Sequence, residues 1–160
     1  MHTLPGEHPR GDSLQFLFLL LFLALWIADS FFLHLTTATF SHTIPLPTRL
    51  FVFAVAVGTG VVLAASGHTA VRHAHGPTRV LTTGAFRYVR HPLYLAMVLL
   101  YFGLAFATGS LASFGLWIVI FLFYDYIAAY EERYMVEQFG KRYTEYREKT
   151  GKWLPRMGRR

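Results

Sequence analysis

The sequence predicts an all-α, polytopic membrane protein with about four transmembrane helices and a cytoplasmic, helical C-terminal extension. The first observation is composition: 54% of the 160 residues are hydrophobic, the mean hydropathy is +0.37, and only 15% are charged, whereas soluble domains carry about 25% charged residues. The second is a series of four long apolar runs, and the third is the segregation of basic residues. At this length we expect residues 1–160 to form a single membrane-embedded domain.

The first two runs are long enough to cross a bilayer, which takes about 17 to 25 mostly apolar residues. The first, Leu14–Leu35, carries Asp29 near its far end, where we expect an interfacial residue. The second, Leu50–Ser66, is expected to continue as a helix past His68. A loop with two prolines and several threonines joins the two runs.

The last two runs are separated by the short sequence GSLAS, which predicts a tight turn. Leu93–Thr108 is short for a span, and its helix is expected to start at Pro92, because proline is favoured in a first turn. Leu111–Tyr130 runs without a breaker into EERYMVEQFGKRYTEYREK. One helix is therefore expected to leave the membrane and continue in water.

The distribution of basic residues predicts how the chain is oriented in the membrane. Of the 15 lysines and arginines, four lie between the second and third runs and nine follow Glu132, while the turn between the third and fourth runs is uncharged. Basic residues in short loops and tails favour the cytoplasmic side. We therefore expect both termini to be cytoplasmic.

Two other kinds of site have weak support in the sequence. Histidines beyond the second run are conceivable metal ligands, but they lack a nearby carboxylate, and no metal is expected: His68, His73 and His75. Aromatic residues interleaved with basic ones in the C-terminal region suit a helix lying on anionic lipid better than nucleic acid: Tyr143, Tyr146 and Trp153. The absence of cysteine excludes thiolate metal sites and cysteine nucleophiles.

The stretch VLTTGAFRYVRHPLYLA places two arginines, a histidine and a proline directly before the third run. It resembles the motif loop of the integral-membrane methyltransferases that include isoprenylcysteine carboxyl methyltransferase and the phospholipid N-methyltransferases, in which R-H-P-x-Y precedes a membrane helix. Glu131 and Glu132, followed by F-G-x-x-Y-x-x-Y, are similar to a second motif of that family. The resemblance covers roughly residues 50–155.

This resemblance implies S-adenosylmethionine as methyl donor, a lipid-like substrate in the bilayer, and a donor site on the cytoplasmic side. Glu131 is expected to face the donor's ammonium, with Glu132 beside it. His91 and Tyr94 are expected to donate hydrogen bonds to the carboxylate or the ribose of S-adenosylmethionine. The adenine is expected to border three apolar residues: Val80, Leu81 and Phe86. Glu131 and Glu132 have the alternative of being interfacial charges paired with Arg87 or Arg133.

Arg90 and Asp125 are the candidate catalytic residues. Asp125 is a carboxyl group within an apolar run, roughly 9 Å deeper than Glu131 along a helix, and such groups are functional candidates. The first hypothesis is an unpaired carboxylate that attracts a substrate ammonium or accepts its proton. The alternative is a buried carboxyl bonded to a tyrosine or to Arg49.

The motifs also depart from the carboxyl-methylating branch. An arginine that contacts the substrate carboxylate there is replaced by Ile127, four positions before Glu131. This favours an amine or other neutral acceptor. Two further functions remain open: a sterol or steroid reductase using a nicotinamide cofactor, because those membrane enzymes resemble the family near the C-terminus, and a non-catalytic membrane scaffold.

Overall fold

The computed structural model describes residues 11–37, 43–73 and 80–156, and in these the regular elements are all helices. Their order is α1 (Gly11–Ile27), the π-helix η1 (Ala28–Leu33), α3 (Leu46–His73), the 3₁₀-helix η2 (Gly84–Arg87), α4 (Pro92–Thr108), α5 (Leu111–Phe139) and α6 (Lys141–Lys149). The predicted all-α class is confirmed.

Among the described residues, three helical segments are long and apolar enough to cross a membrane: Gly11–Leu33, Leu46–His73 and Leu111–Phe139. The fourth apolar helix, α4, has 17 residues and begins at Pro92, as expected. Large apolar side chains point away from the bundle along these helices, and Phe16 is 62% exposed, Val62 67% and Leu122 62%. An exposed apolar surface of this kind suits lipid, so the structure supports the predicted polytopic membrane fold.

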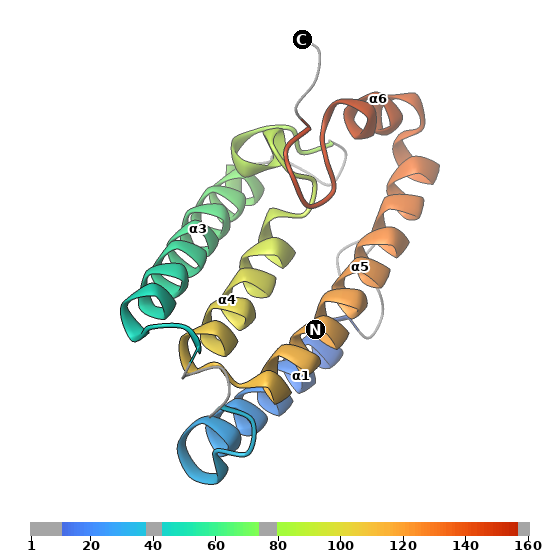
Figure 1. Ribbon diagram of the computed structural model, residues 1–160. Helices are drawn as coiled ribbons and strands as arrows, with labels where there is room; N and C mark the ends of the chain where they lie inside the picture. The colour runs from blue at the N-terminus through green and yellow to red at the C-terminus, as the bar shows by residue number, and fades with distance from the viewer. Residues whose placement is uncertain (1–10, 38–42, 74–79, 157–160) are drawn as a thin grey trace.

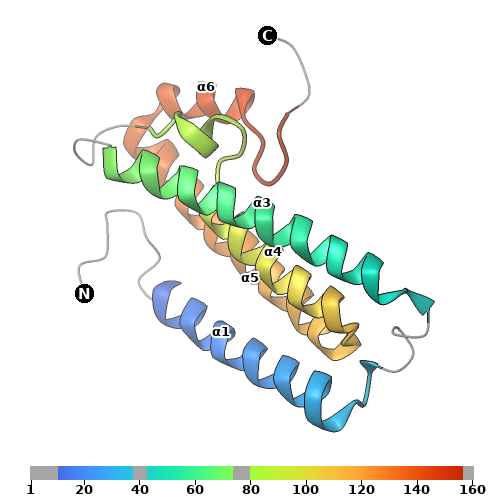
Figure 2. The ribbon, with the colours of Figure 1, turned by 90° about the vertical axis from the view of Figure 1, so that its left-hand side faces the viewer.

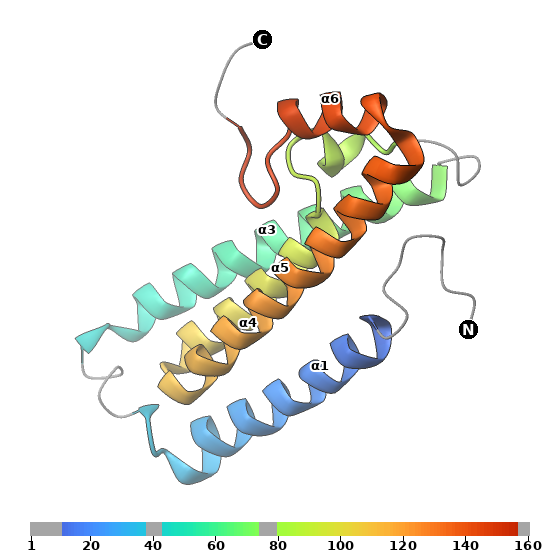
Figure 3. The ribbon, with the colours of Figure 1, turned by 90° about the vertical axis from the view of Figure 1, so that its right-hand side faces the viewer.

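The bundle has α4 and α5 in its centre, with α3 on one side and α1 on the other (Figures 2 and 3). Gly60 of α3 allows the backbones of α3 and α4 to lie close together, because a Cβ atom there would lie 3.1 Å from the backbone oxygen of Ala96 in α4. Tyr101 of α4 fills the space between the other helices, with its ring centroid 4.7 Å from that of Phe22 in α1. Small residues thus bring α3 onto α4, and large ones fill the core.

The C-terminal extension is helical but is not one continuous rod. Gly140, with φ of 54°, ends α5, and α6 turns across the end of the bundle beside η2 (Figure 1). The expectation of a single helix is therefore wrong at Gly140, because a positive φ is adopted readily by glycine and stops the α5 ladder. Tyr143 and Tyr146 of α6 are buried, so the expectation that they lie on a lipid surface is also wrong.

We call the end where α3 and α5 finish and α4 begins the site end, and the opposite end the far end. At the far end Asp29, expected at the interface, is only 3% exposed. It accepts hydrogen bonds from the Thr36 backbone N–H at 3.1 Å, from the Thr36 hydroxyl, and from the Ser110 hydroxyl at 2.5 Å. Arg49 donates to the carbonyl oxygens of Ala107 and Thr108 at the end of α4. Both residues therefore stabilise the far end.

Candidate functional site

The loop that carries R-H-P folds over the site end between α3 and α4. Its turn begins at Gly84, where φ is 58° and a Cβ atom would lie 3.0 Å from the Ser66 backbone oxygen. The Tyr146 hydroxyl of α6 donates to the Phe86 carbonyl oxygen at 2.6 Å. The loop is thus held by α3 beneath it and by α6 above it.

Below this loop lies a cavity of about 510 Å³, within the range typical of small-molecule sites. All the long helices contribute to it. The residues that line it are Asp12 and Gln15 of α1, Ala64 and His68 of α3, Leu81, Phe86, Arg90 and His91 of the loop, Pro92, Leu93, Tyr94, Ala96 and Met97 of α4, and Glu131 and Met135 of α5.

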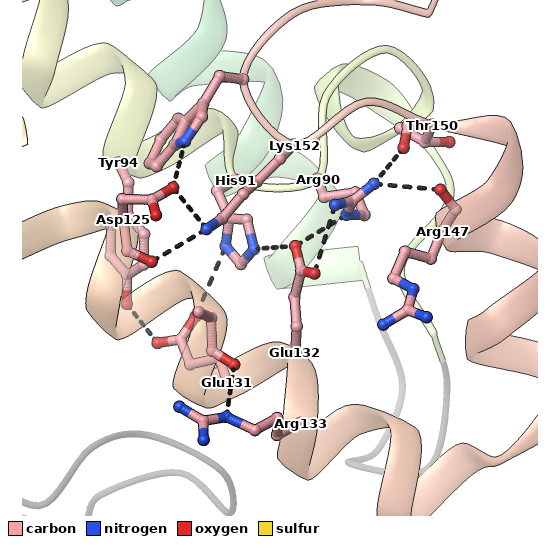
Figure 4. A network of polar contacts seen from close by, with 12 residues as sticks. Arg90, His91, Tyr94, Asp125, Glu131, Glu132, Arg133, Arg147, Thr150 and Lys152 are labelled. Carbon is pink, nitrogen blue, oxygen red and sulfur yellow. Dashed lines mark hydrogen bonds and ion pairs between the residues drawn. The ribbon is translucent and has the colours of Figure 1, made fainter. Parts of the chain in front are cut away.

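Glu131 brings a carboxylate into this cavity from α5. Its Oε1 accepts a hydrogen bond from the Tyr94 hydroxyl, and its Oε2 lies 3.6 Å from His91 Nδ1 (Figure 4). Tyr94 and His91 stand on the first turn of α4 and the residue before it, and their rings are parallel, with centroids 5.7 Å apart. The two motifs recognised in the sequence therefore meet at one carboxylate.

Glu132, the next residue, points elsewhere and does not line the cavity. Arg90 Nε donates to its Oε1 at 2.9 Å, and the side chains of the pair are 8% and 12% exposed. Arg90 also donates to the carbonyl oxygens of Arg147, at 3.1 Å, and Thr150 (Figure 4). Glu132 thus ties the R-H-P loop to α5 and to the chain after α6.

His91 connects the two carboxylates. Its Nε2 lies 3.1 Å from Glu132 Oε1, and its Nδ1 lies 3.6 Å from Glu131 Oε2. Burial lowers the pKa of His91 below its usual value of about 6.5, although the hydrogen bond to Glu132 opposes this.

Asp125 differs from the sequence expectation. It does not line the cavity, and its carboxylate is paired: Lys152 Nζ lies 2.5 Å and Trp153 Nε1 2.8 Å from Oδ1. The expected unpaired carboxylate is wrong, and so are the alternative partners, a tyrosine or Arg49. The chain after α6 folds back toward α5, where the partly buried Trp153 ring packs 5.4 Å from that of Phe121.

Most of the predicted site residues come together at the cavity. Six of them line it: Leu81, Phe86, Arg90, His91, Tyr94 and Glu131. Three do not: Val80, Asp125 and Glu132. Glu132 pairs with Arg90 rather than with Arg87 or Arg133, and Arg133 donates to the Ala129 carbonyl oxygen.

Sequence reasoning missed the contribution of α1. Asp12 and Gln15 stand before the first apolar run, where polar residues are ordinary, so no motif marked them. His68 lines the cavity, but the described residues contain no group of metal-ligating side chains, and His75 lies outside the described residues.

The lining residues fit S-adenosylmethionine. The ammonium of the donor can pair with the Glu131 carboxylate. The donor's own carboxylate and its ribose can form hydrogen bonds with His91 and Tyr94. The adenine can pack against the apolar side chains of Leu81 and Phe86. The apolar lining between these groups is typical of a small-molecule site.

Comparison with known proteins agrees with the motifs. A family model described as phospholipid methyltransferase matches residues 49–142, which is more than half of the chain. No curated protein sequence and no solved structure matches the chain significantly. The matched region includes the R-H-P loop, α4 and all of α5 but begins after α1.

Proposed function

Because the chain belongs to the phospholipid methyltransferase family, we propose that this membrane methyltransferase uses S-adenosylmethionine to methylate a lipid-like acceptor that resides in the bilayer. The observation that carries the proposal is the cavity in which Glu131, Tyr94 and His91 converge beside apolar Leu81 and Phe86. It combines one fixed anion with hydrogen-bonding groups and an apolar wall.

Each of these residues has a role in holding the donor. Glu131 binds the ammonium, and Tyr94 and His91 orient the Glu131 carboxylate and contact the polar groups of the donor. Leu81 and Phe86 border the adenine. When bound, the donor supplies a methyl group on a sulfonium, an activated electrophile, so alignment and exclusion of water are the main tasks of the protein.

Arg90 and Glu132 act as positioning residues in this proposal. Their ion pair is buried and Arg90 also binds two carbonyl oxygens beyond α5. The pair holds the loop that carries His91 over the cavity. Asp125 is assigned no chemical step, because Lys152 and Trp153 occupy its carboxylate.

The acceptor is a neutral nucleophile such as an amine. In the carboxyl-methylating branch, which the sequence resembles in other respects, an arginine binds the substrate carboxylate, and here that position holds Ile127, which is 1% exposed. A buried isoleucine offers no charge to a carboxylate.

Titration of the purified protein in detergent tests the donor. S-Adenosylhomocysteine should bind, and a reduced nicotinamide dinucleotide should not. Binding of the nicotinamide alone would favour the reductase alternative, and binding of neither would favour a non-catalytic scaffold. Calorimetry measures both titrations on the same preparation.

The site end is proposed to face the cytoplasm, because the basic residues gather there. Single cysteines at Glu148 and Leu111, both exposed, report on the two ends of the bundle. An impermeant thiol reagent added outside intact cells should label Leu111→Cys and spare Glu148→Cys. The reverse pattern would invert the orientation.

A further inference from the structure

The first turn of α1 forms a wall of the cavity that the family match does not include. Asp12 and Gln15 line the same space as Glu131, whereas the match begins at residue 49. Residues that recognise the donor lie on α4, α5 and the loop. The α1 wall is therefore available for the second substrate.

The described residues that line the cavity carry unequal charges. Among them are two carboxylates, Asp12 and Glu131, and one guanidinium, that of Arg90. Arg90 is already neutralised by Glu132, and Glu131 is bound by Tyr94 and His91. Within the described residues no ion pair or hydrogen bond is found for the exposed Asp12 carboxylate. Among these residues Asp12 is therefore the lining carboxylate that is open to a ligand.

Asp12 stands at the level along α1 where the headgroup of a bound lipid is expected. It stands in the first turn of a membrane-spanning segment, Gly11–Leu33, one turn above residues that are exposed to lipid, Phe16 (62%) and Leu17 (48%). An acceptor with its alkyl chains against this part of α1 places its polar group level with Asp12 and Gln15. At that level the Asp12 carboxylate favours a headgroup that carries a positive charge.

We propose that Asp12, with Gln15 beside it, binds the ammonium headgroup of the lipid acceptor and so determines specificity for amines. This inference rests on the proposed methyl transfer and adds the acceptor subsite to it. In the reaction the ammonium loses one proton to water at the open mouth of the cavity. The nitrogen lone pair then forms the N–CH₃ bond as the S–CH₃ electron pair returns to sulfur, giving a methylated ammonium and S-adenosylhomocysteine.

The test uses the full chain in detergent and two probes of equal chain length, dodecylamine and dodecanol. Asp12→Asn should weaken dodecylamine binding about fivefold, as expected for a partly exposed ion pair, and should leave dodecanol binding unchanged. It should also raise the KM for an amine acceptor by a similar factor, with S-adenosylhomocysteine affinity unaltered. Glu145→Gln is the matched control, because it removes a carboxylate from α6, outside the cavity.

Two results would overturn the inference. Unchanged dodecylamine affinity in Asp12→Asn would show that the acid does not meet the headgroup, and weakened S-adenosylhomocysteine binding would place Asp12 in the donor subsite. The proposal that S-adenosylmethionine is the donor is contradicted by a separate result, namely that the wild-type protein does not bind S-adenosylhomocysteine. The dodecylamine comparison needs no donor, so the amine subsite is judged in either case.

Discussion

The two ends of the bundle each hold carboxylates within apolar helices, but they use them differently. At the far end Asp29 is 3% exposed and its hydrogen-bond partners are neutral groups of Thr36 and Ser110. At the site end Glu132 pairs with an arginine, and its neighbour Glu131 lines a cavity. A carboxyl group in a membrane helix is a functional candidate by default. The comparison shows that its partners and its access to a cavity decide which role it has.

The largest expected effect is loss of the buried ion pair at the site end. Glu132→Gln leaves the Arg90 guanidinium without its counter-charge, and breaking such a pair costs about 3 to 5 kcal/mol of unfolding free energy. Thermal unfolding in detergent should show a large drop in Tm. Glu137→Gln, an exposed change on the same helix, should not. If the two variants melt alike, Glu132 is not a structural anchor.

Glu131→Gln should have the next largest effect, and on binding rather than stability. It removes the charge opposite the donor's ammonium, and a charge-assisted hydrogen bond is worth about 1.5 to 3 kcal/mol, so S-adenosylhomocysteine affinity should fall about tenfold to a hundredfold. Calorimetry and a melting curve separate the two properties. Unaltered affinity in a folded variant would remove Glu131 from the donor site.

At the far end, Asp29→Asn should show the opposite behaviour. An amide nitrogen placed against the Ser110 and Thr36 hydroxyls loses accepted hydrogen bonds, at a cost of about 1 to 2 kcal/mol in unfolding free energy. Donor affinity should stay the same. A decrease in affinity at constant stability would mean that the two ends are coupled, and the distinction between them would not hold.

Asp125→Asn should have the smallest effect. The Asp125–Lys152 pair is partly exposed, with side chains 44% and 21% accessible, and pairs of this kind contribute about 0.2 to 1 kcal/mol. Stability should fall slightly, and turnover on an amine acceptor should change little. A fall in turnover of about a hundredfold or more with intact donor affinity would instead identify Asp125 as a general base.

The sequence predicted much of the donor site because its motifs are local. R-H-P-x-Y occupies a loop and the first turn of α4, and Glu131 lies on the helix that follows, so six of the predicted residues reach one cavity. Asp125 was misjudged because its partner, Lys152, is 27 residues away on a chain that turns back at Gly140. Asp12 was missed because nothing near it in the sequence relates it to Glu131.

The sequence by itself determined the membrane fold, because a helix that crosses a bilayer needs apolar residues in consecutive turns. The length and apolar composition of each run can be seen without knowing how the runs pack. Its second motif also placed Glu131 and Glu132 next to each other, and we expected both of them at the donor site. Only the tertiary structure decided that Glu132 meets Arg90 while Glu131 meets Tyr94 at the cavity, and that α1 brings Asp12 to the same cavity as Glu131. Those contacts depend on how separate helices pack, and packing is set by side chains distant in the chain.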